Sequence, residues 1–235
     1  MQHRLMGYDR AATMFSPDGR LLQVEYAEKT VRLGSASIGF VCLDGVVIVA
    51  DKRIVDPLIA SPSLKIWEID NHVIASAAGI LSDARILLER AQVVAQQHRV
   101  TYDEAIATES LIRDIADIQQ SATQYAGARP FGIEVMIAGV DRNEECRLFV
   151  SDVTGNYLAY RATAIGENDD QIKEMLRKNK ELLTIEKAIK FALEIFKKVM
   201  GKAFDLARFE VAYITKKEKK VKRISKEALV KYLKK

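Results

Sequence analysis

Histidine and cysteine, the side chains that most often bind transition metals, are few in this chain of 235 residues and stand far apart. The three histidines are His3, His72 and His98, and the two cysteines are Cys42 and Cys146. None of them has the close spacing of a metal-binding motif. The cysteines lie in or beside strand-like segments, which fits buried thiols in a reducing compartment. We therefore expect no metal, no cofactor and no disulfide.

Positive charge is concentrated at the C-terminal end. The formal net charge is +4, and residues 216–235 hold ten Lys and Arg against two Glu, so the remainder is slightly acidic. A basic tail can bind nucleic acid. No aromatic stacking platform or recognition-helix pattern accompanies it, and residues 225–233 have the pattern of a short capped helix. A solvated, lysine-rich helix is favoured over nucleic-acid binding.

No apolar run approaches the length of a membrane-spanning helix, and the longest runs, such as 46–50, have the length of a strand. Hydrophobic residues make up 49% and charged residues 29% of the chain, as in a globular protein with a core. The first residues are polar and do not resemble a signal peptide. We expect a cytoplasmic protein without membrane contact.

The stretch from Phe15 to Gly34 combines a turn with an amphipathic helix. Ser16-Pro-Asp-Gly19 has Pro at the second and Gly at the fourth position of a type I turn. Asp18 is placed to cap the following helix and Gly34 to end it. Apolar residues recur between them at helical spacing, namely Leu21, Leu22, Val24, Tyr26, Ala27 and Val31.

Beyond this helix, hairpins alternate with helix pairs. The expected strands are 36–42, 46–50, 65–69, 72–78, 133–140, 147–152, 157–163, 208–215 and 221–224, and the expected helices are 82–98, 101–124, 168–178, 185–200 and 225–233. Thr101 and Glu104 form a capping box that opens the second long helix. Hairpin connections favour mostly antiparallel pairing, and each helix pair needs a sheet face to cover. We predict an α/β (α+β) fold, in which residues 35–235 form a four-layer αββα sandwich and residues 1–34 an appendage.

Several motifs occur together over nearly the whole chain. They are Gly7-Tyr-Asp-Arg10, Phe15-Ser-Pro-Asp-Gly-Arg-Leu21, Gln23-Val-Glu-Tyr-Ala27, Gly45-Val-Val-Ile-Val-Ala-Asp-Lys-Arg53, Ala126-Gly-Ala-Arg-Pro-Phe-Gly132, Ile137-Ala-Gly-Val-Asp141 and Ala162-Thr-Ala-Ile-Gly166. This set resembles the proteasome α subunits, especially the archaeal ones. The resemblance implies the αββα sandwich of the N-terminal-nucleophile hydrolases, which agrees with the element order.

The resemblance also implies a role. Proteasome α subunits form heptameric outer rings that cap inner rings of proteolytic β subunits. Their N-terminal arms gate the channel through which unfolded protein substrates enter, and their pockets receive the C-terminal tails of regulatory ATPase rings. A non-catalytic structural and gating subunit is therefore expected, with other α subunits, β subunits and an ATPase ring as partners.

The family pattern places gating residues in the arm and the first helix. Tyr8 and Asp9 of one subunit, next to Arg10, would meet Pro17 and Tyr26 of a neighbouring subunit and hold the arm upright. A hydroxyl and a carboxylate can form hydrogen bonds, while the two rings supply rigid packing. Composition alone would instead favour a disordered tail.

The same pattern places Lys65 in a pocket between adjacent subunits, lined by Gly19, Leu21 and Gly34. The Lys65 ammonium would meet the terminal carboxylate of an activator tail. The alternative is a solvated surface lysine, which is the commonest environment of lysine.

A peptidase remains the competing interpretation. By resemblance, the β-subunit nucleophile falls on Ser35, its aspartate on Asp51 and its lysine on Lys65. The chemistry needs a free amino group, which only cleavage after Gly34 would create. Cleavage would discard the signature stretch, and residues 166–169 read Gly-Glu-Asn-Asp where active β subunits have Gly-Ser-Gly-Ser. We expect Ser35 to be inert, Asp51 to pair with a nearby Arg or Lys, and residues 129–132 to form a turn into a strand.

Overall fold

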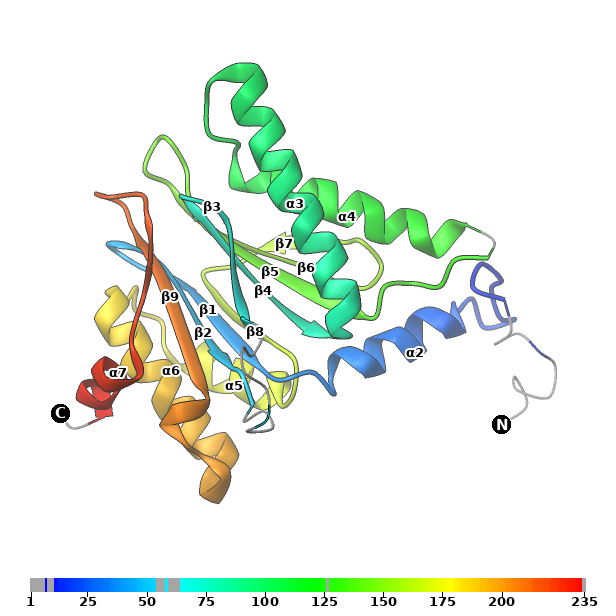
Figure 1. Cartoon of the computed structure of the whole chain (residues 1–235). Coiled ribbons are helices and arrows are strands. Elements are labelled where there is room, and N and C mark those ends of the chain that lie inside the picture. Colours follow the sequence, from blue (N-terminus) through cyan, green and yellow to red (C-terminus); the bar gives the residue numbers. More distant parts are fainter. Residues whose placement is uncertain (1–6, 8–10, 54–57, 59–63, 126, 234–235) are drawn as a thin grey trace.

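The computed structural model describes residues 7, 11–53, 58, 64–125 and 127–233. Within them, two five-stranded sheets stack face to face (Figure 1), and all of their strand pairs are antiparallel. Sheet 1 has the order β10 (Val221–Arg223), β9 (Phe209–Thr215), β2 (Gly45–Asp51), β1 (Ser37–Val41) and β8 (Ala162–Ile165). Sheet 2 has the order β3 (Ile66–Asp70), β4 (Val73–Gly79), β5 (Ile133–Val140), β6 (Cys146–Ser151) and β7 (Tyr157–Ala159).

Two helix pairs cover the outer faces and complete four layers (Figure 1). Helices α5 (Asp169–Lys178) and α6 (Ile185–Met200) pack on sheet 1, and α3 (Leu81–Tyr102) and α4 (Thr108–Gln124) on sheet 2. Helix α7 (Lys226–Leu233) packs beside α6, and the 3-10 turns η1 (Gly201–Ala203) and η2 (Leu206–Arg208) lead into β9. The predicted αββα fold is confirmed. None of the described helices is long and apolar enough to cross a membrane.

Strand β2 illustrates why the layers form. Val46, Ile48 and Ala50 belong to the apolar cluster between the sheets, whereas Val47 and Val49 belong to the cluster under α5 and α6. Successive side chains of a strand point to opposite faces, so a strand covered on both sides is apolar throughout. The continuous apolar run at 46–50 therefore marks a central strand of a sandwich.

The predicted capping box at 101–104 is wrong. Helix α3 runs through to Tyr102 and ends before Asp103, which has a left-handed φ of 51°. Helix α4 begins at Thr108, whose N–H and hydroxyl group donate to Asp141 Oδ1 at 2.9 and 2.7 Å. The partner of this helix start lies 33 residues away, beyond the reach of any local motif.

The predicted strand 157–163 is two strands in different sheets. Residues 157–159 pair with β6 in sheet 2, and residues 162–165 pair with β1 in sheet 1. The chain crosses between the sheets at Tyr160 and Arg161. The Tyr160 N–H donates to Leu148 O, whereas Arg161 O accepts from the Val41 N–H, both at 2.8 Å.

The N-terminal helix is present as α2 (Leu22–Val31), but its predicted ends are wrong. The N-cap position is Leu21 rather than Asp18, and the Leu21 side chain cannot cap the helix. Its C-cap is Arg32 rather than Gly34. The outer end of α2 extends away from the four layers (Figure 1). Its buried residues Val24, Ala27 and Val31 join the cluster between the sheets, so tertiary packing holds this short helix in place.

The segment 129–132 fixes the place where α2 meets sheet 2. The Thr30 hydroxyl of α2 donates to Gly132 O at 2.9 Å. Asp83, in the first turn of α3, accepts from both Arg129 Nη atoms at 2.7 and 2.6 Å and from the Gly132 N–H at 3.0 Å. Residues 129–132 therefore lead into β5, as predicted, and also tie three elements together.

Charge stabilises this junction in a pH-dependent way. Burial by itself would raise the pKa of Asp83, but the hydrogen bonds from Arg129 and Gly132 outweigh it and hold the pKa below its usual range. A depressed carboxyl pKa contributes stability above the pKa of the unfolded state, and that stability is lost as pH falls through the folded pKa.

Replacing Asp83 by Asn should lower the free energy of unfolding by about 1–3 kcal/mol at neutral pH, as expected for a lost charge-assisted hydrogen-bond pair whose Arg is exposed. The difference should shrink in acid. Urea denaturation across pH would measure it. Glu89→Gln is the matched control, because it breaks an exposed Arg85 pair on the same helix and should cost well under about 1 kcal/mol. Equal stability of wild type and Asp83→Asn at neutral pH would contradict the assignment.

Candidate functional site

The predicted turn lies at the outer end of α2 (dark blue in Figure 1). The Gly19 N–H donates to Ser16 O at 2.8 Å, and Gly19 has a φ of +74°. Pro17 and Gly19 are exposed, whereas Leu21 is half-buried and pairs with Phe15 in an isolated β-bridge. The turn therefore exposes its Pro and Gly instead of packing them into the core.

Tyr26 is half-buried on α2, and the Lys29 ammonium lies 5.3 Å from the centroid of its ring. Tyr8, Asp9 and Arg10, the expected gating residues of the arm, lie outside the described residues. The structure therefore describes only the helix side of the expected gating contact.

Gly34 lies at the inner end of α2, where three backbone segments meet. A Cβ atom on Gly34 would stand 2.2 Å from the nitrogen of Gly79. One on Gly79, whose φ is +124°, would stand 2.0 Å from Gly132 O, and one on Gly132 would stand 2.5 Å from Thr30 Oγ1. Only glycine permits these approaches. We call Gly34, Gly79 and Gly132 the glycine stack.

Lys65 is buried, with 7% of its surface exposed, so the solvated-lysine alternative is wrong. Its Nζ donates to Ala77 O at 2.6 Å, and its N–H donates to Glu210 Oε2 at 2.9 Å. The Ser76 hydroxyl donates to Lys65 O at 3.0 Å. Both the backbone and the side-chain tip of Lys65 are therefore held.

The ammonium of Lys65 is easy to deprotonate. Burial lowers the pKa of Lys65 to about 8; Arg53 also lowers it, while the carboxylates of Asp51 and Glu210 partly offset the shift. A buried cation that bonds only a neutral carbonyl is poorly compensated. An incoming carboxylate would supply the missing charge.

Asp51, at the end of β2, is 4% exposed and paired, as predicted. Its carboxylate accepts from Arg208 Nη2 at 2.7 Å, from Arg208 Nε at 3.1 Å and from the Arg53 N–H at 3.0 Å. Ser35 is half-buried, and the preceding carbonyl, Gly34 O, accepts from the Glu167 N–H at 2.8 Å. The segment that differs from active β subunits thus binds the backbone next to Ser35.

The chain brings together only part of the expected pocket. Lys65 bonds to Ala77, and Gly34 abuts Gly79, so both lie at the same end of β4. Gly19 and Leu21 lie at the other end of α2, about 15 Å away along the helix axis. One chain therefore does not join all four residues in a single pocket.

The sequence patterns do not indicate two residues that contact Lys65 or its neighbour Ile66. Glu210, on β9, accepts from the Lys65 N–H, and Arg223, on β10, donates from Nη2 to Ile66 O at 2.8 Å. Arg223 Nη1 also forms an ion pair with Glu210 Oε1. A carboxylate within the apolar run 209–214 was the available signal, but its partner lies 145 residues away.

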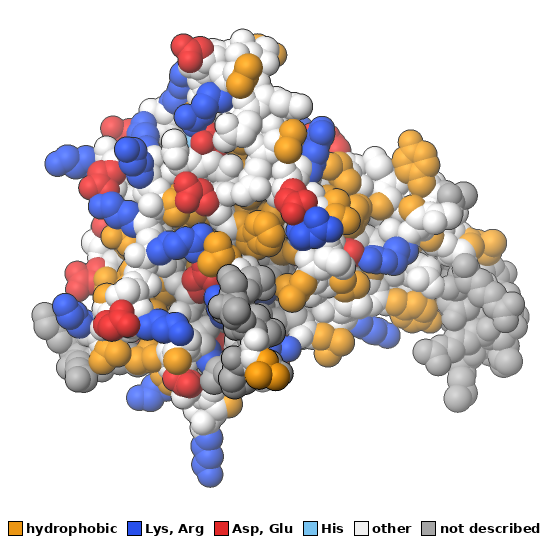
Figure 2. Space-filling view, in the orientation of Figure 1, with side chains coloured by type: hydrophobic (Ala, Val, Ile, Leu, Met, Phe, Trp, Pro, Cys, Tyr) orange, Lys and Arg blue, Asp and Glu red, His pale blue; other side chains and the backbone are white. Residues whose placement is uncertain are grey.

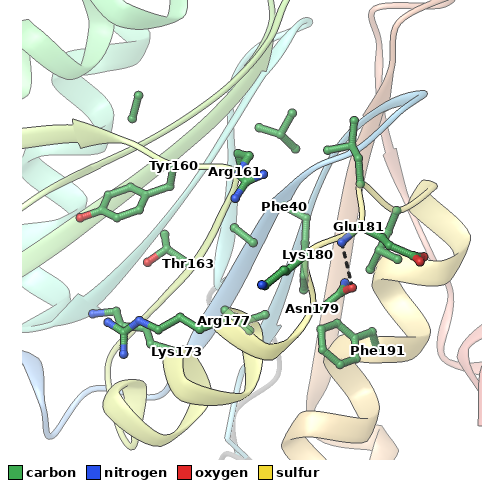
Figure 3. Close-up of a pocket in the computed structure, with 16 residues that line it drawn as sticks. Phe40, Tyr160, Arg161, Thr163, Lys173, Arg177, Asn179, Lys180, Glu181 and Phe191 are labelled. Carbon is green, nitrogen blue, oxygen red and sulfur yellow. Dashed lines mark hydrogen bonds between the residues drawn. The ribbon is translucent and has the colours of Figure 1, made fainter.

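The chain also has a basic pocket (Figure 3). Its volume is about 690 Å³, and none of the expected site residues lines it. It is bounded by the sheet crossover, α5 and the following loop, with Arg161, Arg177 and Lys180 on its walls and Phe40 and Phe191 beside them.

Apolar side chains are exposed around α2 and the turn before it (Figure 2). They include Phe15, Met14 and Leu33, of which 63%, 48% and 73% of the surface is exposed. In the described part of the chain, no group of three or more His, Cys, Asp or Glu side chains could hold a metal ion.

Comparison with known proteins gives the family. Residues 31–214 match the family described as "Proteasome subunit", and residues 8–29 match the N-terminal signature of the A-type proteasome subunits. The chain is 43% identical over 230 residues to the proteasome α subunit of Methanosarcina thermophila, covering 97% of this chain and 93% of the relative. It is 43% identical over 229 residues to that of Pyrococcus horikoshii, with 97% and 87% coverage, and 42% identical over 230 residues to that of Methanocaldococcus jannaschii, also with 97% and 87% coverage. The chain therefore belongs to the proteasome subunit family and carries the signature of its α subunits.

Proposed function

We propose that this chain is a non-catalytic subunit of the outer, heptameric ring of a cytoplasmic proteasome, stacked on a ring of proteolytic β subunits. Residues 1–34 act as an appendage that makes ring contacts and gates the channel for unfolded substrates. The observation that carries the proposal is α2 with its turn. This element matches the α-subunit signature, is held by the core at one end, and exposes Phe15 and Met14 at the other.

The exposed side chains favour contact with a neighbouring copy. Apolar side chains grouped on one face mark an interaction surface. The expected pocket residues also separate into two groups at opposite ends of α2, which fits a pocket completed by two adjacent subunits. Contact between the turn of one copy and the Lys65 end of the next would bring Gly19 and Leu21 toward Lys65.

The peptidase alternative receives little support. The nitrogen of Ser35 lies in a peptide bond, so it cannot act as the free amine of this mechanism. Asp51 is bound by Arg208, and Lys65 Nζ bonds to Ala77. Activity at Ser35 would require loss of α2, whose buried residues belong to the core.

The gating role places Tyr8, Asp9 and Arg10 in an arm that blocks the channel. Removal of residues 1–12 should leave the turn and α2 in place. In particles assembled with active β subunits, it should speed cleavage of a fluorogenic peptide several-fold, because entry then no longer waits for the arm to move. Titration of the β active sites controls for assembly. An unchanged rate, in a particle whose full-length form is closed, would contradict gating by the arm.

Docking of an ATPase tail is assigned to Lys65. Lys65→Met retains the apolar stem and approximate volume but removes the charge. It should weaken docking by about 2–5 kcal/mol per pocket, since Lys65 is buried, and leave basal peptide cleavage unchanged. Stimulation should also decline as pH rises through about 8, because the ammonium then loses its proton.

Measurement of ATPase-stimulated and basal cleavage side by side, over a range of pH, separates these effects. Lys187→Met, at an exposed position on α6, is the matched control and should behave as wild type. Normal stimulation of Lys65→Met particles would remove Lys65 from docking. Loss of basal activity would instead reveal an assembly defect.

A further inference from the structure

Two carboxylates act on the Lys65 ammonium electrostatically, those of Asp51 and Glu210. Within the described residues, however, Lys65 forms no ion pair with either, and its Nζ bonds to the neutral carbonyl of Ala77. This arrangement is unusual, because a buried ammonium is normally paired with a carboxylate. The reason is that both carboxylates already have other hydrogen-bond partners.

Glu210 has both oxygens engaged. Oε1 pairs with Arg223 Nη1, and Oε2 accepts from the Lys65 N–H. The Glu210 side chain is 13% exposed and that of Arg223 is 33% exposed, so solvent screens this pair only in part. Because Arg223 also donates to Ile66 O, it fixes the backbone beside Lys65 while it neutralises Glu210.

The carboxylate oxygens of Asp51 also both accept hydrogen bonds from other residues. Its two oxygens accept from Arg208 and from the Arg53 N–H, and its side chain is 6% exposed. Arg208 thus binds both oxygens of Asp51 through Nε and Nη2, whereas Arg223 gives Nη1 to Glu210 and Nη2 to Ile66 O. Arg208 lies in η2, directly before β9, and Arg223 lies in β10. Both arginines therefore lie in or next to the hairpin that β9 and β10 form.

We propose that Arg223 and Arg208 are positioning residues that keep the Lys65 charge unpaired, so that the site is selective for a carboxylate brought by a partner. This inference rests on the proposed docking function. Without either arginine, the adjacent carboxylate would turn to Lys65 and form an internal ion pair. The partner's carboxylate would then have to displace an existing ion pair.

We expect docking to weaken in a single variant at Arg223 and to recover in a double variant that also changes Glu210. Arg223→Gln should free Glu210 to pair with Lys65, raise the pKa of Lys65 above about 8, and weaken docking by roughly tenfold, within the range of coupled neighbours. Adding Glu210→Gln to Arg223→Gln should restore docking, because the competing carboxylate is gone and the amide oxygen can still accept from the Lys65 N–H.

Two readouts test this on the full-length chain. Competitive acetylation of amines across pH values around 8, with the Lys65 peptide quantified by mass spectrometry, reports the pKa of Lys65 without any activator. Stimulation of assembled particles by a purified archaeal regulatory ATPase reports docking. Glu218→Gln is the control, because it breaks the exposed Lys222 pair in the same hairpin and should change neither readout.

A raised pKa in Arg223→Gln, together with restored docking in the double variant, would support the proposal. An unchanged pKa, or a double variant that docks no better than Arg223→Gln, would overturn it and leave Arg223 a merely structural residue. Normal stimulation of Lys65→Met would overturn the docking function itself, and the acetylation result would distinguish that failure from a failure of the arginine pairs.

Discussion

The close approach of backbone at the glycine stack is the constraint on which the rest of this structure depends. At Gly34, Gly79 and Gly132 the chain leaves α2, ends β4 and enters β5 with no room for a side chain. Thr30 bonds to the last of these glycines, and Asp83 holds the same segment from α3. Helix α2 is thereby attached to sheet 2, and the backbone just before Ser35 is packed against the core.

This attachment sets what the neighbouring polar residues can do. The residues that correspond by resemblance to a nucleophile, its aspartate and its lysine lie around the same end of the sandwich, but the chain uses them differently. Asp51 is bound by Arg208, and Lys65 is buried with its charge unmatched. Lys65, which by resemblance would handle a proton in a peptidase, is here the residue that we propose binds a carboxylate, and burial lowers its pKa to about 8.

Local patterns predicted most of the fold, because strand alternation and helical spacing are set by neighbouring residues. These local patterns failed where contacts with residues far away in the sequence determine the structure. The segment 157–163 has the composition of one strand, yet its halves pair with different sheets. The family pattern alone places Lys65 in the site, and that pattern does not predict that Lys65 is buried. Glu210 and Arg223 could not be predicted, since they reach residues 65 and 66 across 145 and 157 positions of sequence.

We infer that α2 remains a permanent part of the folded chain, so that Ser35 stays internal. Native mass spectrometry of the chain recovered from particles assembled with β subunits tests it most directly, because one spectrum reports both ring stoichiometry and the mass of each chain. We expect a heptamer whose subunits all retain the residues before Ser35. Subunits that begin at Ser35 would contradict it and revive the peptidase interpretation.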